Sequence, residues 1–129
     1  MISEDYVSFE TAKLLKKKGF DENTPVNYFV GDDKLRGCIV GEMVYHNRAE
    51  EDTHLIACPT LQMAMKWLRD NNGIAVIPTL SSILDNEKFL WDIKIVVAKN
   101  GESYSQGWIY ESYEHACDVA IKYCLKSLI

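Results

Sequence analysis

The C-terminal stretch ESYEHACDVAIKYCLKSLI contains a histidine, two cysteines and several acids in one predicted helix, a set that could bind a metal or transfer protons. Cys117 and Cys124 share a helix face, but they lie about 10.5 Å apart along the axis, too far to bind one metal ion. His115 and Cys117 point to nearly opposite sides. His115 and Asp118 could hydrogen-bond across one turn, but such pairs are typical of surfaces rather than of catalytic dyads. We therefore interpret the segment as a core helix with two buried, reduced thiols.

The other histidines and cysteines also form no familiar site. Cys38, His46, His54 and Cys58 have spacings that match no common zinc knuckle or ribbon. His54 and Cys58 could share a metal only on a helix, which Pro59 and the β-like HLIAC disfavour. The sequence contains no glycine-rich phosphate loop, GxSxG or HExxH. It therefore predicts no catalytic, cofactor-binding or metal-binding residue and no cofactor.

Many carboxylates fall in predicted loops or at strand ends, where such groups are usually solvated. One alternative is a small enzyme or nucleotide-processing factor that uses them or Cys38. The carboxylates in question are Glu42, Glu50, Glu51, Asp52, Asp85 and Glu87.

Composition indicates an ordinary globular protein, because 47% of the 129 residues are hydrophobic and 26% are charged. This length predicts one domain, residues 1–129. No apolar run approaches the roughly 20 residues that cross a bilayer, and MISEDYVSFE has acids where a signal peptide needs basic residues. We expect a cytoplasmic protein that does not bind membranes.

The first helix is predicted in VSFETAKLLKKKGF, with Ser8 as its N-cap and Gly19 just after its end. Phe20 is then placed to contact Leu15, as in a Schellman ending. The helix end contains the one basic cluster, which the helix dipole favours there and which could alternatively bind phosphate. Its members are Lys13, Lys16, Lys17 and Lys18.

Two more helices have clear caps and apolar stripes. The second lies in PTLQMAMKWLRDNNG, with Thr60 as its N-cap and Gly73 after its end. Its stripe contains Leu61, Ala64, Met65 and Leu68. The third begins after Ser112. Its stripe contains Tyr113, Cys117, Ala120, Ile121, Cys124, Leu125 and Leu128.

Strands are predicted between and after the first two helices. VNYFV (26–30) and CIVGEMVYH (38–46), separated by the turn-rich GDDKLRG, indicate a hairpin. GIAVIPTL (73–80) predicts a short strand, in which Pro78 puts the far end at a sheet edge or outside the ladder.

A second hairpin is predicted in KFLWDIKIVVAKNGESYSQGWIYES. If Asn100 and Gly101 form a two-residue type I′ turn, Val97 pairs with Tyr104, and the pairs Lys99–Glu102, Ile93–Trp108 and Trp91–Tyr110 follow. One face then contains Phe89, Trp91, Ile93, Ile95, Val97, Tyr104, Trp108 and Tyr110. The opposite face contains Leu90, Val96 and Ile109.

These elements predict an α+β fold in the order α-β-β-α-β-β-β-α, with an antiparallel sheet packed by helices mainly on one side. The last five elements follow the order of double-stranded RNA-binding domains. Those domains need basic residues at the start of the final helix, where this sequence reads ESYEHACD. The net charge of -5 also opposes phosphate binding. We therefore expect no nucleic-acid partner.

Three segments, YVSFETAKLLKKKGF, PTLQMAMKWLRDNNGIAVIP and SYEHACDVAIKYCLKSLI, resemble small uncharacterised proteins of phages, prophages and mobile elements of gut Bacteroidetes. The resemblance covers about half of the chain, in three blocks of fixed order. It implies no activity, cofactor or catalytic residue. It does imply an accessory protein of a mobile element in a bacterial cytoplasm.

The sequence thus favours a non-catalytic accessory protein that binds an unidentified protein partner, and it leaves a homo-oligomer open. The small enzyme described above is the alternative, and a nucleic-acid-binding module is less favoured. Apolar residues on both faces of the predicted hairpin fit the first role, because either the first helix with residues 26–46 or a partner must cover the second face.

Our first prediction is that RNA and DNA bind no tighter than about 100 μM at physiological salt, the weak end of nonspecific affinity. The physical reason is the acids Glu111, Glu114 and Asp118 at the start of the last helix. A gel-shift assay with labelled duplex RNA and single-stranded DNA measures this. A salt-dependent shift at low micromolar protein, abolished by changing Lys16, Lys17 and Lys18 to glutamate, would contradict it.

Overall fold

The computed structural model describes residues 5–24, 26–29, 34–37, 55–105 and 109–129. The chain divides into two compact units, Met1–Met63 and Ala64–Ile129. Each unit combines helical structure with a three-stranded antiparallel sheet, so the predicted α+β class is confirmed. The predicted order of elements is also found, with one strand more between the first two helices. The single domain over residues 1–129 stays a prediction.

The sheet of the N-terminal unit has the order β2-β1-β3. Its strands are β1 (Val26–Phe29), β2 (Lys34–Gly37) and β3 (Leu55–Ala57), and β1 pairs antiparallel with both neighbours. A hairpin therefore begins at the first predicted strand. Its second strand, however, occupies the end of the predicted turn GDDKLRG, while the expected strand 38–46 lies outside the described residues.

The helix α1 (Phe9–Lys17) begins and ends as the sequence predicts. Ser8 Oγ accepts a hydrogen bond from the Thr11 N–H at 3.3 Å, which satisfies one free donor of the first turn. Gly19 has φ 94°, and the Phe20 N–H donates to the Leu15 carbonyl at 2.9 Å. This 6→1 bond is the Schellman ending, in which the left-handed residue favours glycine.

The helix α2 (Leu61–Asn72) begins in the first unit and continues into the second. The Met63 N–H donates to Thr60 Oγ1 at 3.1 Å, so Thr60 is the N-cap as predicted. The whole predicted stripe is buried, and Trp67 is buried beside it. The stripe consists of Leu61, Ala64, Met65 and Leu68.

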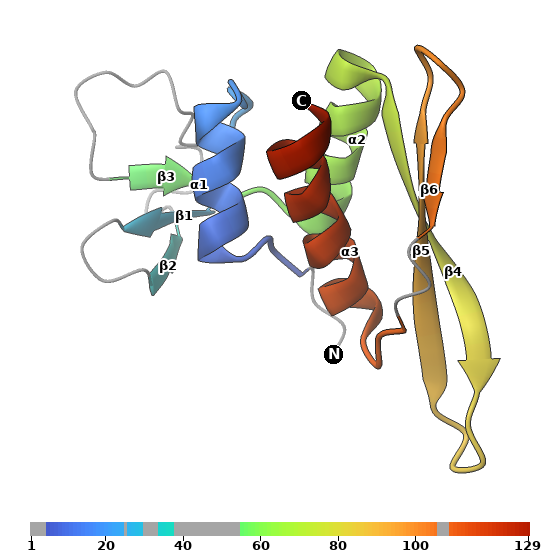
Figure 1. Ribbon diagram of the computed structural model, residues 1–129. Coiled ribbons are helices and arrows are strands. Elements are labelled where there is room, and N and C mark those ends of the chain that lie inside the picture. The colour runs from blue at the N-terminus through green and yellow to red at the C-terminus, as the bar shows by residue number, and fades with distance from the viewer. Residues whose placement is uncertain (1–4, 25, 30–33, 38–54, 106–108) are drawn as a thin grey trace. The chain divides into compact units, whose positions relative to one another are not determined.

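The C-terminal unit contains the sheet β4-β5-β6. Its strands are β4 (Ile74–Ile83), β5 (Phe89–Val97) and β6 (Ser103–Ser105), and α3 (Tyr113–Tyr123) continues into the π-helical turn Cys124–Leu128. Figure 1 shows α3 and the α2 turns of this unit on the same face of the sheet. The predicted order of the last five elements, with the helices on one side, is therefore observed.

Strand β4 is longer than predicted, because it continues past Pro78 to Ile83. The Ala98 N–H donates to the Gly73 carbonyl at 2.8 Å, so alternate residues from Gly73 onward bond to β5. The nitrogen of Pro78 then faces the open edge, where its missing N–H costs no ladder bond. A bulge between Leu80 and Ser82 shifts the register near the far end of the strand.

The turn between β5 and β6 differs from the predicted one. Type I′ needs a positive φ at both central residues, but Asn100 lacks it and Gly101, at φ 69°, has it. The Asn100 side chain instead accepts a hydrogen bond from the Glu102 N–H at 2.9 Å. A wider loop results, closed by bonds from the Gly101 N–H to the Val97 carbonyl and from the Val97 N–H to the Glu102 carbonyl, both 2.9 Å.

The wider loop changes the pairing of β6 but not its face. Tyr104 pairs with Ile95, not with Val97 as predicted, while the predicted pair of Trp91 with Tyr110 is confirmed. A slip of two residues keeps every side chain on its predicted side, since the period of a strand is two. The predicted partner of Ile93, Trp108, lies outside the described residues.

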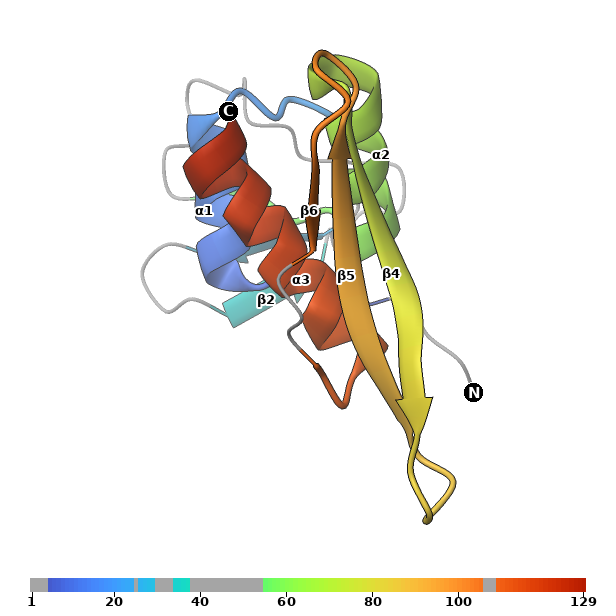
Figure 2. The same cartoon turned by 45° about the vertical axis from the view of Figure 1, so that its right-hand side comes forward.

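The β4–β5 hairpin extends beyond β6 and beyond the first turn of α3, as Figure 2 shows. The hairpin closes in a three-residue loop, in which the Glu87 N–H donates to the Leu84 carbonyl and the Leu84 N–H to the Lys88 carbonyl. Glu87 has φ 64°, a left-handed conformation that favours glycine at this position of the loop.

Our second prediction is that Glu87→Gly stabilises the protein by about 0.5–1 kcal/mol, because removing left-handed strain outweighs the extra chain entropy of glycine. Urea unfolding measures the free energy. Glu87→Ala is the matched control, since it removes the same charge but keeps the strain. Equal stability of the two variants would show that the backbone of Glu87 is not strained.

Candidate functional site

The side chains of α3 that could perform chemistry are either buried apart from one another or exposed. Cys117 and Cys124 are buried free thiols, as predicted. Burial raises the pKa of the Cys117 thiol to about 11 and that of the Cys124 thiol to about 12. His115 is exposed, and its imidazole meets the ring of Tyr110 edge-on at 5.5 Å. The helix therefore contributes two neutral core thiols and one surface imidazole.

The described residues contain no group of three or more His, Cys, Asp or Glu side chains arranged to bind a metal ion. Of the candidate ligands named from the sequence, Cys58 is buried, and its Sγ lies 3.6 Å from the Val7 carbonyl oxygen. Cys38, His46 and His54 lie outside the described residues.

Two of the six candidate carboxylates lie among the described residues. Asp85 and Glu87 lie exposed in the loop between β4 and β5. The others lie outside the described residues, namely Glu42, Glu50, Glu51 and Asp52.

Two lysines of the α1 cluster have structural contacts. The Lys16 ammonium donates to the Leu55 carbonyl at 3.3 Å, and the Lys13 ammonium lies 5.2 Å from the centre of the Phe9 ring. In both contacts a lysine ammonium interacts with another residue of the N-terminal unit. They support a structural role for part of the cluster rather than a phosphate-binding one.

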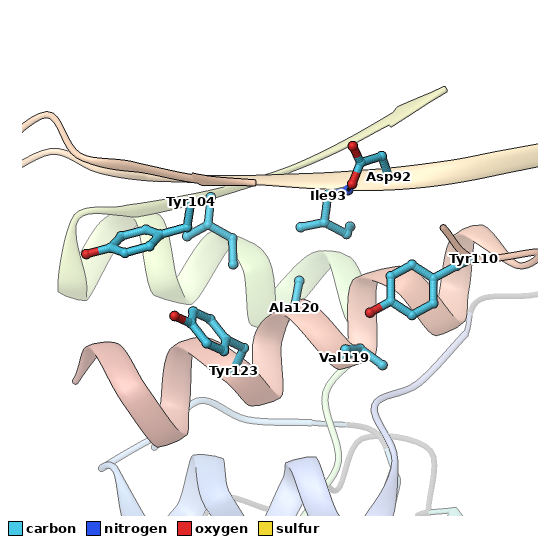
Figure 3. Close-up of a pocket in the computed structure, with 8 residues that line it drawn as sticks. Asp92, Ile93, Tyr104, Tyr110, Val119, Ala120 and Tyr123 are labelled. Carbon is cyan, nitrogen blue, oxygen red and sulfur yellow. Dashed lines mark hydrogen bonds between the residues drawn. The ribbon is translucent and has the colours of Figure 1, made fainter. Parts of the chain in front are cut away.

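A small pocket lies between the sheet and α3 in the C-terminal unit (Figure 3). Tyr104 and Tyr110 project into it from the sheet side, and Val119 and Tyr123 from α3. Its volume is about 20 Å³, enough for about one water molecule. The carboxylate of Asp92 points away from α3 and accepts a hydrogen bond from the Ile93 N–H at 2.7 Å. The pocket is thus an apolar packing gap.

Two tyrosines of this pocket, Tyr104 and Tyr110, are not poised for proton transfer near neutral pH. The hydrogen bond from the Tyr104 hydroxyl to Glu102 Oε2, 2.6 Å long, raises the pKa of Tyr104. Burial, with a smaller contribution from Asp92, raises the pKa of Tyr110. Both phenols therefore stay protonated, whereas a general base needs a pKa near the working pH.

The most distinctive surface is an apolar patch on the far half of the β4–β5 hairpin, which we call the tip surface. Its members are Leu80, Ile83, Leu84 and Phe89, exposed by 50%, 61%, 39% and 51%. Leu80 pairs with Trp91 and Ile83 with Phe89, so these side chains share the face of the sheet on which α3 packs. The hairpin extends past α3 (Figure 2), so no described helix of the C-terminal unit covers this part of the face.

An open groove joins the tip surface to the first turn of α3. Its apolar floor includes Phe89, Trp91 and Tyr113, and its volume is about 390 Å³. The Trp91 and Tyr113 rings meet edge-on at 5.1 Å. The charged groups of its lining are three carboxylates and one ammonium, from Glu87, Glu111, Glu114 and Lys88. We call this feature the acidic groove.

The sequence indicates only part of this site. Phe89 and Trp91 belong to the predicted aromatic face, but Ile83 lies beyond the predicted end of β4. A signal for it exists in GIAVIPTLSSIL, an uncharged run with β-branched residues on both sides of Pro78. The bulge that puts Ile83 on the face of Leu80 has no such signal.

No protein-family model matches the chain, and neither curated proteins nor solved structures include a significant match. Within the described part of the chain, no helix is long and apolar enough to cross a membrane.

Our third prediction concerns the thiols of α3. Cys117 and Cys124 should react slowly with a thiol reagent at pH 8 in the native protein and rapidly after unfolding in urea, because burial removes both access and thiolate. Peptide mass spectrometry measures labelling at each cysteine. Rapid native labelling of either residue would contradict the core interpretation.

The same raised pKa values predict the effect of pH on stability. The buried neutral thiols favour the folded state below pH 9, the ordinary thiol value, and this contribution is lost as pH rises toward 11 and 12. The double variant Cys117→Ala, Cys124→Ala should therefore lose less free energy of unfolding above pH 9 than the wild-type protein.

Proposed function

We propose that this protein is a non-catalytic module that binds another protein through the tip surface and the acidic groove. The single observation that supports this most is the gathering of large apolar side chains on one hairpin. Leu80, Ile83 and Phe89, each at least 50% exposed, share one face, and Leu84, 39% exposed, is next to Ile83. Single exposed apolar residues are ordinary, but a contiguous group beside a groove is typical of interaction sites.

The groove and the patch together resemble the organisation of a protein interface. The aromatic floor offers large rings that a partner can bury, and the charged residues lie around it. Glu87 keeps a left-handed backbone that a glycine would adopt more easily, and it lines the groove. A strained residue at a surface groove is consistent with selection for binding rather than for stability.

Support for the alternative enzyme role is weaker among the described residues. The small pocket between the sheet and α3 is apolar and holds about one water, whereas ligand sites usually measure about 300–1,000 Å³ and contain a few polar groups. The acidic groove is large enough, but the hydroxyl of Ser112, which lies 3.1 Å from the Glu114 carboxylate, is engaged as the N-cap of α3. We further propose the cellular context that the sequence resemblance implies, an accessory protein of a phage or mobile element in the bacterial cytoplasm.

Our fourth prediction tests the surface. The triple change Leu80→Ser, Ile83→Ser and Phe89→Ser should lower recovery of the bound protein by at least about tenfold in affinity capture, since buried apolar anchors supply most interface energy. The measurement is quantitative mass spectrometry of captures from infected or lysogenic bacterial cells. The comparison is with wild-type protein under the same conditions.

A matched control removes three other large, exposed apolar side chains. The triple change Ile77→Ser, Ile109→Ser and Ile129→Ser affects residues exposed by 41%, 57% and 41% outside the tip surface. It should leave recovery unchanged. If both triple variants recover every partner at the wild-type level, or if both lose it equally, the tip surface is not the binding site.

A further inference from the structure

The tip surface has the width of one helix and the length of a short one. Two strands about 4.8 Å apart form a ribbon about 10 Å wide, close to the diameter of an α-helix. From Leu80 to Leu84 the ribbon extends about 13 Å, the length of about nine helical residues. The near half of the same face is already covered by a helix, α3, whose Tyr113 meets Trp91.

An added strand fits this hairpin less well than a helix. The outer edge of β4 is open to a new strand along the hairpin, but Pro78 presents no N–H there. The bulge between Leu80 and Ser82 interrupts the edge again a short distance further on. Prolines and bulges both hinder edge pairing. The face of the hairpin has no such obstacle.

Charge decides which helix would fit. The groove lining contains Glu87, Glu111 and Glu114 against Lys88, a local excess of two negative charges. A second copy of the chain would bring two such acidic rims together, and like charges across an interface are unfavourable. A segment with lysine or arginine around an apolar stripe would be attracted.

We infer that the occupant of the tip surface is a basic amphipathic helical segment of a partner protein, about two to three turns long. This inference rests on the proposed function and adds the chemical class of the partner. The apolar stripe of the segment lies on Leu80, Ile83 and Phe89. Its basic residues lie near Glu87, Glu111 and Glu114.

The test uses displayed random peptides of about 16 residues, which are long enough for the roughly three helical turns required. Selection on the wild-type protein is combined with counter-selection on the Leu80→Ser, Ile83→Ser, Phe89→Ser variant. The enriched peptides should have net positive charge and apolar residues at i, i+3, i+4 and i+7. Circular dichroism of a synthetic representative should show helix gained on binding.

Matched charge variants separate a local effect from the overall negative charge. Glu87→Gln with Glu111→Gln and Glu114→Gln should weaken the synthetic peptide by about tenfold, or about 1.4 kcal/mol for three rim charges. The control triple variant should bind like wild type. It changes exposed acids outside the groove, Asp5→Asn, Glu22→Gln and Asp70→Asn.

Three results would overturn the inference. The first is enrichment of peptides that need the tip surface but are neutral, acidic or strand-like in pattern. That result would refute the basic helical partner and would still support the tip surface as the binding site. A dimer in sedimentation equilibrium that the Leu80, Ile83 and Phe89 changes dissociate would make a second copy the occupant. Failure to enrich any peptide that depends on the tip surface would refute both the inference and the proposed function.

Discussion

The C-terminal unit depends on the packing of one apolar helix face against one face of the β4–β5 ladder. A two-stranded hairpin alone is marginal in water, and β6 adds only three residues to the sheet. The helix α3 supplies the missing burial, since its Ala120 and Tyr123 lie opposite Ile93 and Ile95 of the sheet. The far half of the hairpin has no such cover, so its order depends on the ladder that begins under α3.

This packing explains why cysteines and a histidine on one helix do not form a reactive site. Ala116, Cys117, Ala120 and Cys124 are small side chains and all are buried, so they form part of the packed face of the helix. A thiol in that position behaves as a small apolar group, and burial keeps it protonated. His115 is on the solvent side of the same helix. Amphipathic geometry therefore separates the groups that sequence proximity places together.

At the tip of the hairpin, by contrast, apolar side chains are exposed and the local backbone conformation is unfavourable. Apolar side chains that would favour burial stay in solvent, and Glu87 adopts a conformation that favours glycine. Natural proteins usually protect such hairpins with charges or short strands, yet GIAVIPTLSSIL contains no charge. These departures from local stability occur together around one groove. That coincidence is why we assign the binding role to this end of the unit.

The sequence by itself determined the features that depend only on residues close together in the chain. The caps Ser8, Thr60 and Ser112 and the α+β order followed from local chemistry and spacing, and the structure contains all of them. The aromatic face was also predictable, because alternation survives a register error of two residues. The proposed function and the cellular context were expected from the sequence and stay proposals.

Only the tertiary structure decided how far β4 runs, where its bulge lies and which apolar residues stay uncovered. A strand pattern gives a face but not the point at which a packing helix ends, since that point depends on contacts between distant segments. The bulge places Leu80 and Ile83, three residues apart, on one face, where simple alternation would separate them. The acidic groove likewise joins a hairpin loop to a helix start that the sequence separates by more than twenty residues.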